Sequence, residues 1–194
     1  MSGRPPLRIL TVCSHNRTRS VMMAALLDAM ITDRLGSGAA VVRSSGFGPE
    51  GIPAIDDAVA AMQRRGLDVS SHRSCSTTAA LVDGADVIIT AERAHVVKIA
   101  ALSPSAFPRA MTLPELLDRS ADAPLDASWT SVIDWVNSLT ADRTAGVYLR
   151  EQVREVDDPT GSMPRAFEAA VGAIERQCLD LSDVLARVTR DLSS

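Results

Sequence analysis

The sequence predicts a single α/β domain over residues 1–194, built on a four-stranded parallel sheet flanked by helices. Three observations lead to this prediction. Short apolar runs rich in β-branched residues alternate with stretches of helix-forming residues, which is typical of βαβ units. The chain has 194 residues, enough for one domain with a sizeable core. Its composition, 46% hydrophobic and 23% charged, is that of an ordinary globular protein.

Four stretches have the pattern of buried strands. Each contains a short apolar run with β-branched residues, bounded by polar residues or glycine. Because helical stretches separate these runs, the strands are expected to pair in parallel. In chain order they are Leu7–Val12, Ala39–Gly46, Asp86–Ala91 and a short strand at the start of Arg109–Arg119.

Helix-forming residues fill the stretches between and after the strands. Ile52–Gly66 has an acidic start, a basic end and a terminal glycine, which suits the helix dipole. Gly36 is placed to end the helix that precedes it. The predicted helices are Ser20–Leu35, Ile52–Gly66, a short one from near Thr77, Glu92–Leu102, the second part of Arg109–Arg119, and Met163–Leu192.

One stretch, residues 120–155, is less regular than the rest. It holds both tryptophans, Trp129 and Trp135, and the only tyrosine, Tyr148. Residues 127–139 within it predict an added helix. We therefore interpret residues 120–155 as a helical addition within the domain, and not as a second domain.

Charge, hydropathy and cysteine content exclude several classes of protein. The net charge of −4 argues against a nucleic-acid binder. No apolar run reaches the roughly 18 residues that span a bilayer, and the first residues lack a signal-peptide layout, so we expect no membrane contact. Three cysteines, Cys13, Cys75 and Cys178, form no disulfide framework, and a reducing cytoplasm is the expected setting. Without a CxxC or a Cys/His cluster, we expect neither a metal nor a cofactor.

Chemistry is concentrated where the first strand leads into the first helix. Cys13 follows the apolar run, and in parallel sheets ligands bind beyond the carboxyl ends of strands. Backbone N–H groups of the loop and the helix start favour an anion, and Arg19 can bind two oxygens of a phosphate at once. The same field favours a thiolate on Cys13, a nucleophile. The predicted phosphate-binding residues are Ser14, His15, Asn16, Arg17, Thr18, Arg19 and Ser20.

A thiol that attacks phosphorus also needs a proton donor for the leaving oxygen. The best candidate lies in residues 155–161, just ahead of the last helix, where Pro159 and Gly161 indicate a loop. Asp158 precedes the proline, so its backbone is expected to be extended. We interpret Asp158 as the general acid and Asp157 as part of the turn.

These residues resemble the low-molecular-weight protein tyrosine phosphatase family, and the resemblance covers most of the chain. It rests on the spacing C-x5-R-S at the first strand, on a late Asp-Pro, on "RSSG" at 43–46, on "RRGLDVSSHRS" at 64–74 and on "DVIITAERAHV" at 86–96. The resemblance implies the fold of phosphotyrosine phosphatase I. It also implies a phosphomonoester hydrolase with a cysteinyl-phosphate intermediate, which acts on a phosphorylated protein or a small phosphomonoester.

The resemblance also implies a role for each site residue. Cys13 would be the nucleophile, Arg19 the phosphate clamp and Asp158 the general acid. The roles of the other residues support these three. Asn16 would hold the loop, helped by Ser44 and His72, Ser20 would donate to the thiolate, and Phe47 would form a wall for the substrate.

The chain departs from the family pattern at several positions. His15 stands where many members have glycine, and Thr18 where many have a second cysteine. The aromatic pair that often follows Asp-Pro is replaced by Thr160 and Gly161. Aromatic walls hold a phenyl ring, so this replacement bears directly on the choice of substrate.

Two other functions remain open at this stage. The loop is similar to that of arsenate reductases on the same fold. Thioredoxin-linked reductases need a pair of cysteines in the region of Cys75, and residues 75–102 contain no second cysteine. A reductase that uses a small thiol would not need this pair. A non-catalytic module that binds a phosphorylated partner would also keep the loop. We expect Cys75 and Cys178 to be structural and His95 to lie on the surface of its helix.

Overall fold

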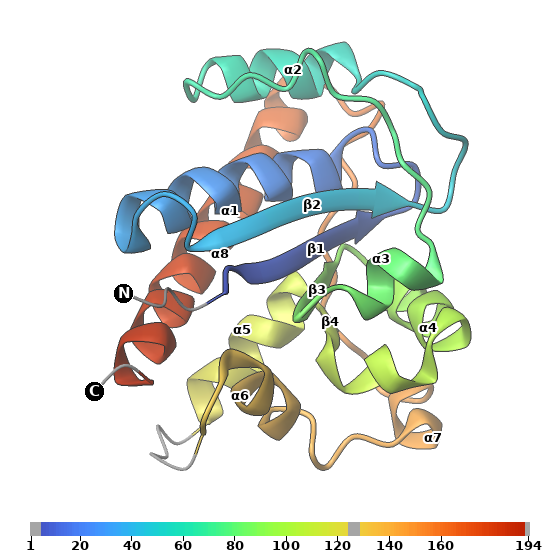
Figure 1. Cartoon of the computed structure of the whole chain (residues 1–194). Helices are drawn as coiled ribbons and strands as arrows, with labels where there is room; N and C mark the ends of the chain where they lie inside the picture. The colour runs from blue at the N-terminus through green and yellow to red at the C-terminus, as the bar shows by residue number, and fades with distance from the viewer. Residues whose placement is uncertain (1–4, 124–128, 193–194) are drawn as a thin grey trace.

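The computed structural model describes residues 5–123 and 129–192. At its centre lies a sheet of four parallel strands in the order β2-β1-β3-β4 (Figure 1). The strands are β1 Leu7–Cys13, β2 Ala40–Gly46, β3 Val87–Thr90 and β4 Ala110–Thr112. The predicted fold class is therefore confirmed, and each strand overlaps the stretch predicted for it.

Helices flank the sheet on both faces. α1 and α8 pack against each other on one face, and α3 and α4 cover the other. The helices are α1 Arg19–Leu35, α2 Asp56–Gln63, α3 Ala79–Asp83, α4 Arg93–Leu102, the 3-10 helix η1 Pro104–Arg109, α5 Leu113–Asp122, α6 Val132–Ser138, α7 Ala145–Tyr148 and α8 Pro164–Asp191.

Side chains of β1 alternate between two hydrophobic cores, as the pleat of a strand requires. Ile9 and Cys13 belong to the core beneath α1 and α8, whereas Leu10 and Val12 belong to the core beneath α3 and α4. Every residue of β3 is buried, which is typical of an inner strand of a parallel sheet. The cores therefore hold the carboxyl ends of β1 and β3 side by side.

Helix α2 is shorter than predicted at both ends. Residues 52–55 are extended, with Pro53 bridged to Arg73 and the Ile52 N–H donating to Ser74 Oγ. At the other end the chain turns at Gly66, whose φ is +74°. Apolar spacing alone did not show that residues 52–55 pair with a segment twenty residues further on.

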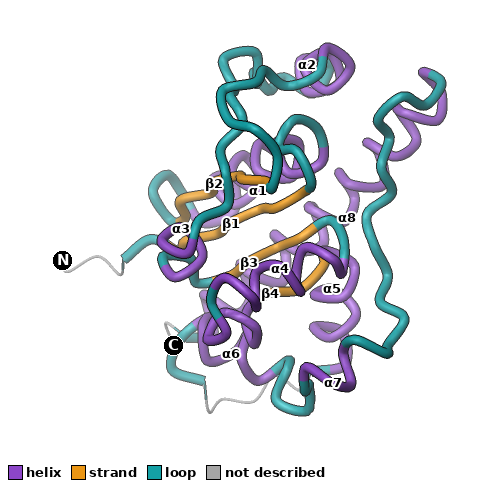
Figure 2. The backbone as a smooth tube through the Cα atoms, turned by 90° about the vertical axis from the view of Figure 1, so that its right-hand side faces the viewer, coloured by secondary structure: helices purple, strands orange, loops and turns teal. Residues whose placement is uncertain are grey.

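The segment between α5 and α8 adds two helices and a long loop. The predicted added helix is present as α6, although residues 127 and 128 of that prediction lie outside the described residues. α7 was not predicted. From α7 the loop of residues 149–163 runs along the side of the molecule to the start of α8 (Figure 2), and it carries Asp158 toward the sheet.

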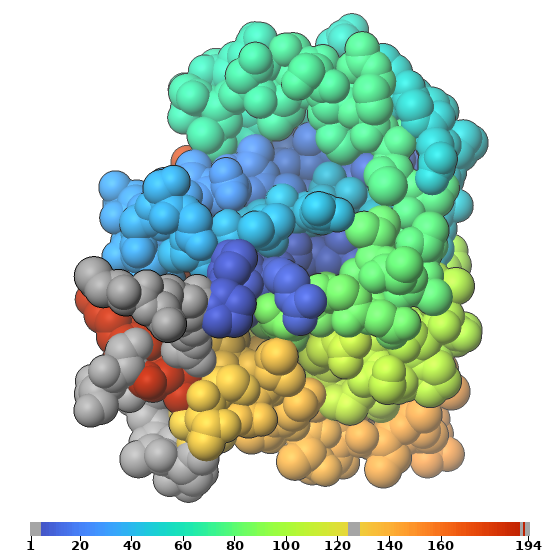
Figure 3. Space-filling view, viewed as in Figure 1, coloured from blue at the N-terminus to red at the C-terminus, as the bar shows by residue number. Residues whose placement is uncertain are grey.

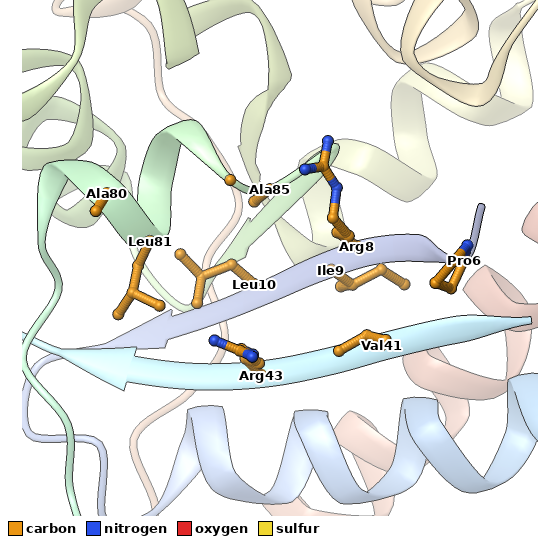
Figure 4. Close-up of a pocket in the computed structure, with 10 residues that line it drawn as sticks. Pro6, Arg8, Ile9, Leu10, Val41, Arg43, Ala80, Leu81 and Ala85 are labelled. Carbon is orange, nitrogen blue, oxygen red and sulfur yellow. The ribbon is translucent and has the colours of Figure 1, made fainter. Parts of the chain in front are cut away.

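A surface groove lies along the start and middle of β1 and β2, next to α3. Its volume is about 310 Å³, and Leu10, Val41, Arg43 and Leu81 line it (Figure 4). In the space-filling view the hollow lies between β2 and α3 (Figure 3). Because Cys13 ends β1, the groove is separate from the loop that follows that strand.

Candidate active site

Cys13 is the last residue of β1, and α1 begins six residues later at Arg19. The intervening loop therefore lies at the carboxyl edge of the sheet, with a helix N-terminus behind it. The Cys13 thiol is almost fully buried, and its Sγ lies 3.1 Å from Ser20 Oγ. Sulfur, loop and helix start thus meet at one point, where the N–H groups of a helix start favour an anion.

Asn16 holds the shape of this loop from its centre. It is the one non-glycine residue with a positive φ (+52°) among the described residues, and it is completely buried. Its Nδ2 donates to Ser20 Oγ over 2.9 Å, and its Oδ1 accepts from the Cys75 N–H over 2.8 Å. His72 Nε2 lies 2.7 Å from the Asn16 carbonyl oxygen. Neighbouring segments therefore secure a backbone conformation that asparagine tolerates better than most residues do.

Gly46 packs directly under the loop. It pairs with Cys13 in the sheet, and a Cβ there would lie 2.6 Å from the Asn16 nitrogen and 2.9 Å from the Cys13 oxygen. Only a residue without a side chain leaves this space for the loop. Ser44, which was expected to support the loop, pairs with Thr11 in the sheet, and its side chain makes no hydrogen bond to the loop among the described residues.

The guanidinium of Arg19 is 3% exposed and meets three partners. Nη1 donates to the Val156 carbonyl over 3.1 Å. Nη2 lies 2.6 Å from Glu92 Oε1 and 2.9 Å from Asp158 Oδ2. The structure thus brings Asp158 to Arg19 across 139 positions of sequence.

Asp158 sits on an exposed part of the long loop, with 48% of its side chain accessible. Its Oδ1 accepts the Thr160 N–H over 3.0 Å, and Thr160 Oγ1 lies 3.3 Å from Thr18 Oγ1. The following Pro159 is buried. One end of this turn is therefore fixed while the carboxylate itself faces solvent, a suitable arrangement for a group that must exchange a proton.

Two side chains that sequence reasoning did not place in the site come from the start of α4. Glu92 caps this helix, and its carboxylate pairs with Arg19. His95 is 1% exposed, so the prediction that it lies on the helix surface is wrong. Its Nδ1 accepts the Glu92 N–H over 3.1 Å, and its Nε2 lies 3.1 Å from Ser14 Oγ. Burial lowers the pKa of His95 to about 4, which keeps the imidazole neutral at pH 7.

Phe47 lies beside the loop, where a wall for the substrate was expected. Its N–H donates to the Ser14 carbonyl over 2.8 Å, and its ring stacks on His95 with 5.9 Å between ring centroids. Lys98 Nζ lies 4.9 Å from the centre of the same ring. The half-buried phenyl ring is thus fixed between the loop and α4.

The remaining loop residues differ in their surroundings. His15 is exposed, and its side chain lies close to Gly48. Arg17 donates through Nε to the Pro53 carbonyl over 2.8 Å, which ties the loop to the segment before α2. Thr18 is buried at the N-cap position of α1, although its side chain accepts no cap hydrogen bond.

The other two cysteines lie in contrasting places. Cys178 is completely buried in α8, where burial raises the pKa of its thiol. Cys75 is exposed and touches the loop through its backbone. Within residues 5–123 and 129–192, no cluster of His, Cys, Asp and Glu side chains is suited to a metal ion. Nor does any helix in those ranges have the length and apolar character to cross a membrane.

A model of the family described as low molecular weight phosphotyrosine protein phosphatase matches residues 8–128. A curated relative named probable low molecular weight protein-tyrosine-phosphatase EpsP, from Ralstonia solanacearum, is 36% identical over 117 residues. That alignment covers 60% of this chain and 77% of the relative. The family match ends before Asp158, so the placement of this residue in the site rests on the geometry around Arg19.

Solved structures of the same fold cover nearly the whole chain. YwlE arginine phosphatase from Geobacillus stearothermophilus aligns with a TM-score of 0.68 at 24% identity and covers 93% of each chain. A YwlE arginine phosphatase variant with a phosphorylated active-site serine aligns with a TM-score of 0.70 at 22% identity. It covers 95% of this chain and 99% of its own. These likenesses extend the shared fold past residue 128 to the long loop and α8.

Proposed function

The chain belongs to the low molecular weight phosphotyrosine protein phosphatase family, and we propose that it hydrolyses phosphomonoesters through a phosphoenzyme on Cys13. The observation that carries the proposal is the meeting of three groups at one loop. Cys13 supplies a thiol, Arg19 a guanidinium fork, and Asp158 a carboxyl group that reaches Arg19 from the far end of the chain. A protein that only binds phosphate has no use for the third group.

In the first step the Cys13 thiolate attacks phosphorus. The S–P bond forms as the bond from phosphorus to the alcohol oxygen breaks, and Asp158 gives its proton to that oxygen. Arg19 and the loop N–H groups hold the oxygens of the transferred group and stabilise the charge that develops on them. The products are the free alcohol and a phosphocysteine.

In the second step water attacks the phosphocysteine. Asp158, now a carboxylate, takes a proton from the water, the S–P bond breaks, and inorganic phosphate leaves. Ser20 Oγ, 3.1 Å from Cys13 Sγ, donates to the returning thiolate. Because the nucleophile must be a reduced thiol, we place the chain in a reducing compartment such as the cytoplasm.

The residues around the loop suggest a broader substrate class than phosphotyrosine alone. Phe47 provides an aromatic wall beside the loop. After Asp158-Pro159, Thr160 and Gly161 occupy the positions where an aromatic pair would hold a phenyl ring. We therefore expect turnover of phosphotyrosine and of small phosphomonoesters, in phosphorylated proteins or free.

One purified sample decides between the functions left open by the sequence. It is assayed with p-nitrophenyl phosphate, with peptides carrying phosphotyrosine, phosphoserine or phosphoarginine, and for arsenate reduction with thioredoxin or a small thiol. We expect release of phosphate from the aryl ester and the phosphotyrosine peptide, and none from Cys13→Ser, which should still bind phosphate. Arsenate reduction without phosphate release would favour the reductase, and binding without any turnover would favour the non-catalytic module.

A further inference from the structure

The first turn of α4 touches both ends of the loop. Where the loop ends, Glu92 Oε1 lies 2.6 Å from Arg19 Nη2, and where the loop begins, His95 Nε2 lies 3.1 Å from Ser14 Oγ. Glu92 and His95 are themselves joined in a capping box, each side chain accepting the backbone N–H of the other residue. One rigid helical turn therefore contacts the residue after the nucleophile and the phosphate clamp together.

Hydrogen bonding fixes which nitrogen of His95 carries the proton. Nδ1 accepts the Glu92 N–H, so in the neutral ring Nε2 bears the hydrogen and donates it to Ser14 Oγ. The ring stays neutral because burial outweighs the attraction of Glu92 and Asp158, while Arg19 and Lys98 also disfavour the charged form. At pH 7 the neutral ring therefore offers its Nε2 hydrogen to Ser14.

Ser14 is the residue through which this contact reaches the chemistry. It directly follows Cys13, and its carbonyl accepts the Phe47 N–H over 2.8 Å. In a loop whose successive N–H groups converge on an anion, the first N–H after the nucleophile must keep its direction. Without the His95 contact, the described structure holds Ser14 only through its backbone.

We propose that His95 is a positioning residue which, by donating from Nε2 to Ser14 Oγ, keeps the start of the oxyanion loop in its binding geometry. This inference rests on the proposed function, since it assumes that the loop receives a phosphoryl group. It assigns His95 no contact with the substrate. We expect His95 to affect the affinity for an oxyanion and kcat, mainly through its contact with Ser14.

A double-mutant cycle tests the proposal. Asparagine at position 95 can retain an acceptor for the Glu92 N–H while it loses the donor to Ser14, so His95→Asn separates the two contacts. Orthovanadate affinity is measured by calorimetry, and kcat with p-nitrophenyl phosphate, for the wild type, Ser14→Ala, His95→Asn and the double variant. We expect each single variant to lose about two- to tenfold in vanadate affinity, the size of one hydrogen bond. We expect the double variant to lose no more than the worse single variant.

A control separates positioning from helix stability. Ser131 caps α6 by accepting the Asp134 N–H, and α6 lies far from the loop (Figure 1). Ser131→Ala should lower the melting temperature without changing vanadate affinity. Additive losses in the cycle, or unchanged affinity in both single variants, would overturn the inference. Vanadate binding by a wild type that turns over no ester would instead overturn the proposed function, and a wild type that does not bind vanadate would overturn both.

Discussion

Arg19 pairs with two carboxylates, Glu92 and Asp158, and this sharing has consequences for the acid. A phosphoryl group held by the guanidinium competes with Asp158 for the same nitrogen. Glu92 is 30% exposed and is held by the capping box, whereas Asp158 is 48% exposed and lies on a loop. Asp158 is therefore the partner that yields. Once released from Arg19, its carboxylate can take up the proton that it then gives to the leaving oxygen.

Substitution of Asp158 should affect poor leaving groups most. General acid assistance contributes typically 10²–10⁴-fold when the leaving oxygen needs a proton, and a nitrophenolate needs little help. We expect Asp158→Asn to lose more kcat/KM, which reports the first step, on phenyl phosphate than on p-nitrophenyl phosphate. Asp157→Asn, the matched control on the same turn, should be mild on both. Equal losses on both esters, or a larger loss for Asp157→Asn, would place the acid elsewhere.

The same variant should bind product more tightly. Without the Asp158 carboxylate, inorganic phosphate meets no competitor at Arg19 on that side. Asp158 is about half exposed, so solvent screens its pair with the buried Arg19, and we expect about a two- to fivefold gain in phosphate affinity, measured by calorimetry near pH 7. Asp157→Asn should leave this affinity unchanged. Weaker binding in Asp158→Asn would show that the ion pair does not oppose the anion.

At the scale of elements, the loop depends on the strand beside it. Gly46 lies in β2 against Cys13 and Asn16, and an added Cβ would come within 2.6 Å of backbone. Backbone atoms move only with the strand or loop that carries them. A single methyl group at this position therefore shifts the whole oxyanion loop.

Gly46→Ala should reduce activity strongly. A displacement of catalytic groups by about 1 Å can cost on the order of 10²-fold in rate, and overpacking costs about 1–3 kcal/mol of stability. Gly172→Ala is the control, because a Cβ there meets only Arg176 at 3.5 Å and alanine favours a helix. Both variants are compared by kcat/KM and by urea unfolding. Near-normal kinetics in Gly46→Ala would contradict the close contact.

The sequence alone was sufficient for the elements whose patterns are local. The prediction for Cys13 came from an apolar strand that runs straight into a helix start, and the prediction for Asp158 from a residue that precedes a proline in a loop. The structure brings these two residues to Ser20 and Arg19, respectively. The sequence did not indicate that Glu92 and His95 belong to the site, because polar residues in the first turn of a helix usually face solvent. Only the strand order places the end of β3 beside the end of β1, and neighbouring parallel strands end at the same edge. The signal in the sequence that could have identified them is the position of Glu92 and His95 directly after a buried strand.

The residues that support the loop, and helix α7, also depend on tertiary contacts that the sequence pattern does not show. Ser44 was chosen from the resemblance, but in the structure it is Gly46, two residues later, that touches the loop. α7 was not predicted, because Ala145–Tyr148 is too short to show a period. The burial of Tyr148 comes from its tertiary contacts, since its hydroxyl donates to Glu115 Oε2 over 3.1 Å.

At the scale of the whole molecule, one buried ion pair joins the added segment to the sheet domain. Arg143 Nη1 lies 3.1 Å from Glu115 Oε1, and both side chains are almost inaccessible. Arg143 also donates to the Ala110 carbonyl at the start of β4, and its guanidinium covers the ring of Phe107. The segment that carries α7 is thereby held against α5 and β4, upstream of the loop with Asp158.

Loss of Arg143 should destabilise the chain without changing the chemistry. Arg143→Met leaves Glu115 buried with a weakened set of partners, at a cost of about 3–5 kcal/mol in the free energy of unfolding. Arg154→Ala, which breaks the exposed pair with Asp118, should cost less than about 1 kcal/mol. Urea unfolding gives both values, and kcat of the folded protein should stay near normal. Equal costs would contradict the account of this pair.

The covalent intermediate on Cys13 is the claim on which the account depends most. Asp158→Asn slows the second step, so its phosphoenzyme should accumulate and be trapped by rapid acid quench after mixing with p-nitrophenyl phosphate. Mass spectrometry of the peptide that contains Cys13 is the measurement. The account predicts that this peptide gains one phosphoryl group during a burst of p-nitrophenolate, and that Cys13→Ser shows no burst. Release of p-nitrophenolate while the Cys13 peptide stays unmodified at every quench time would contradict it.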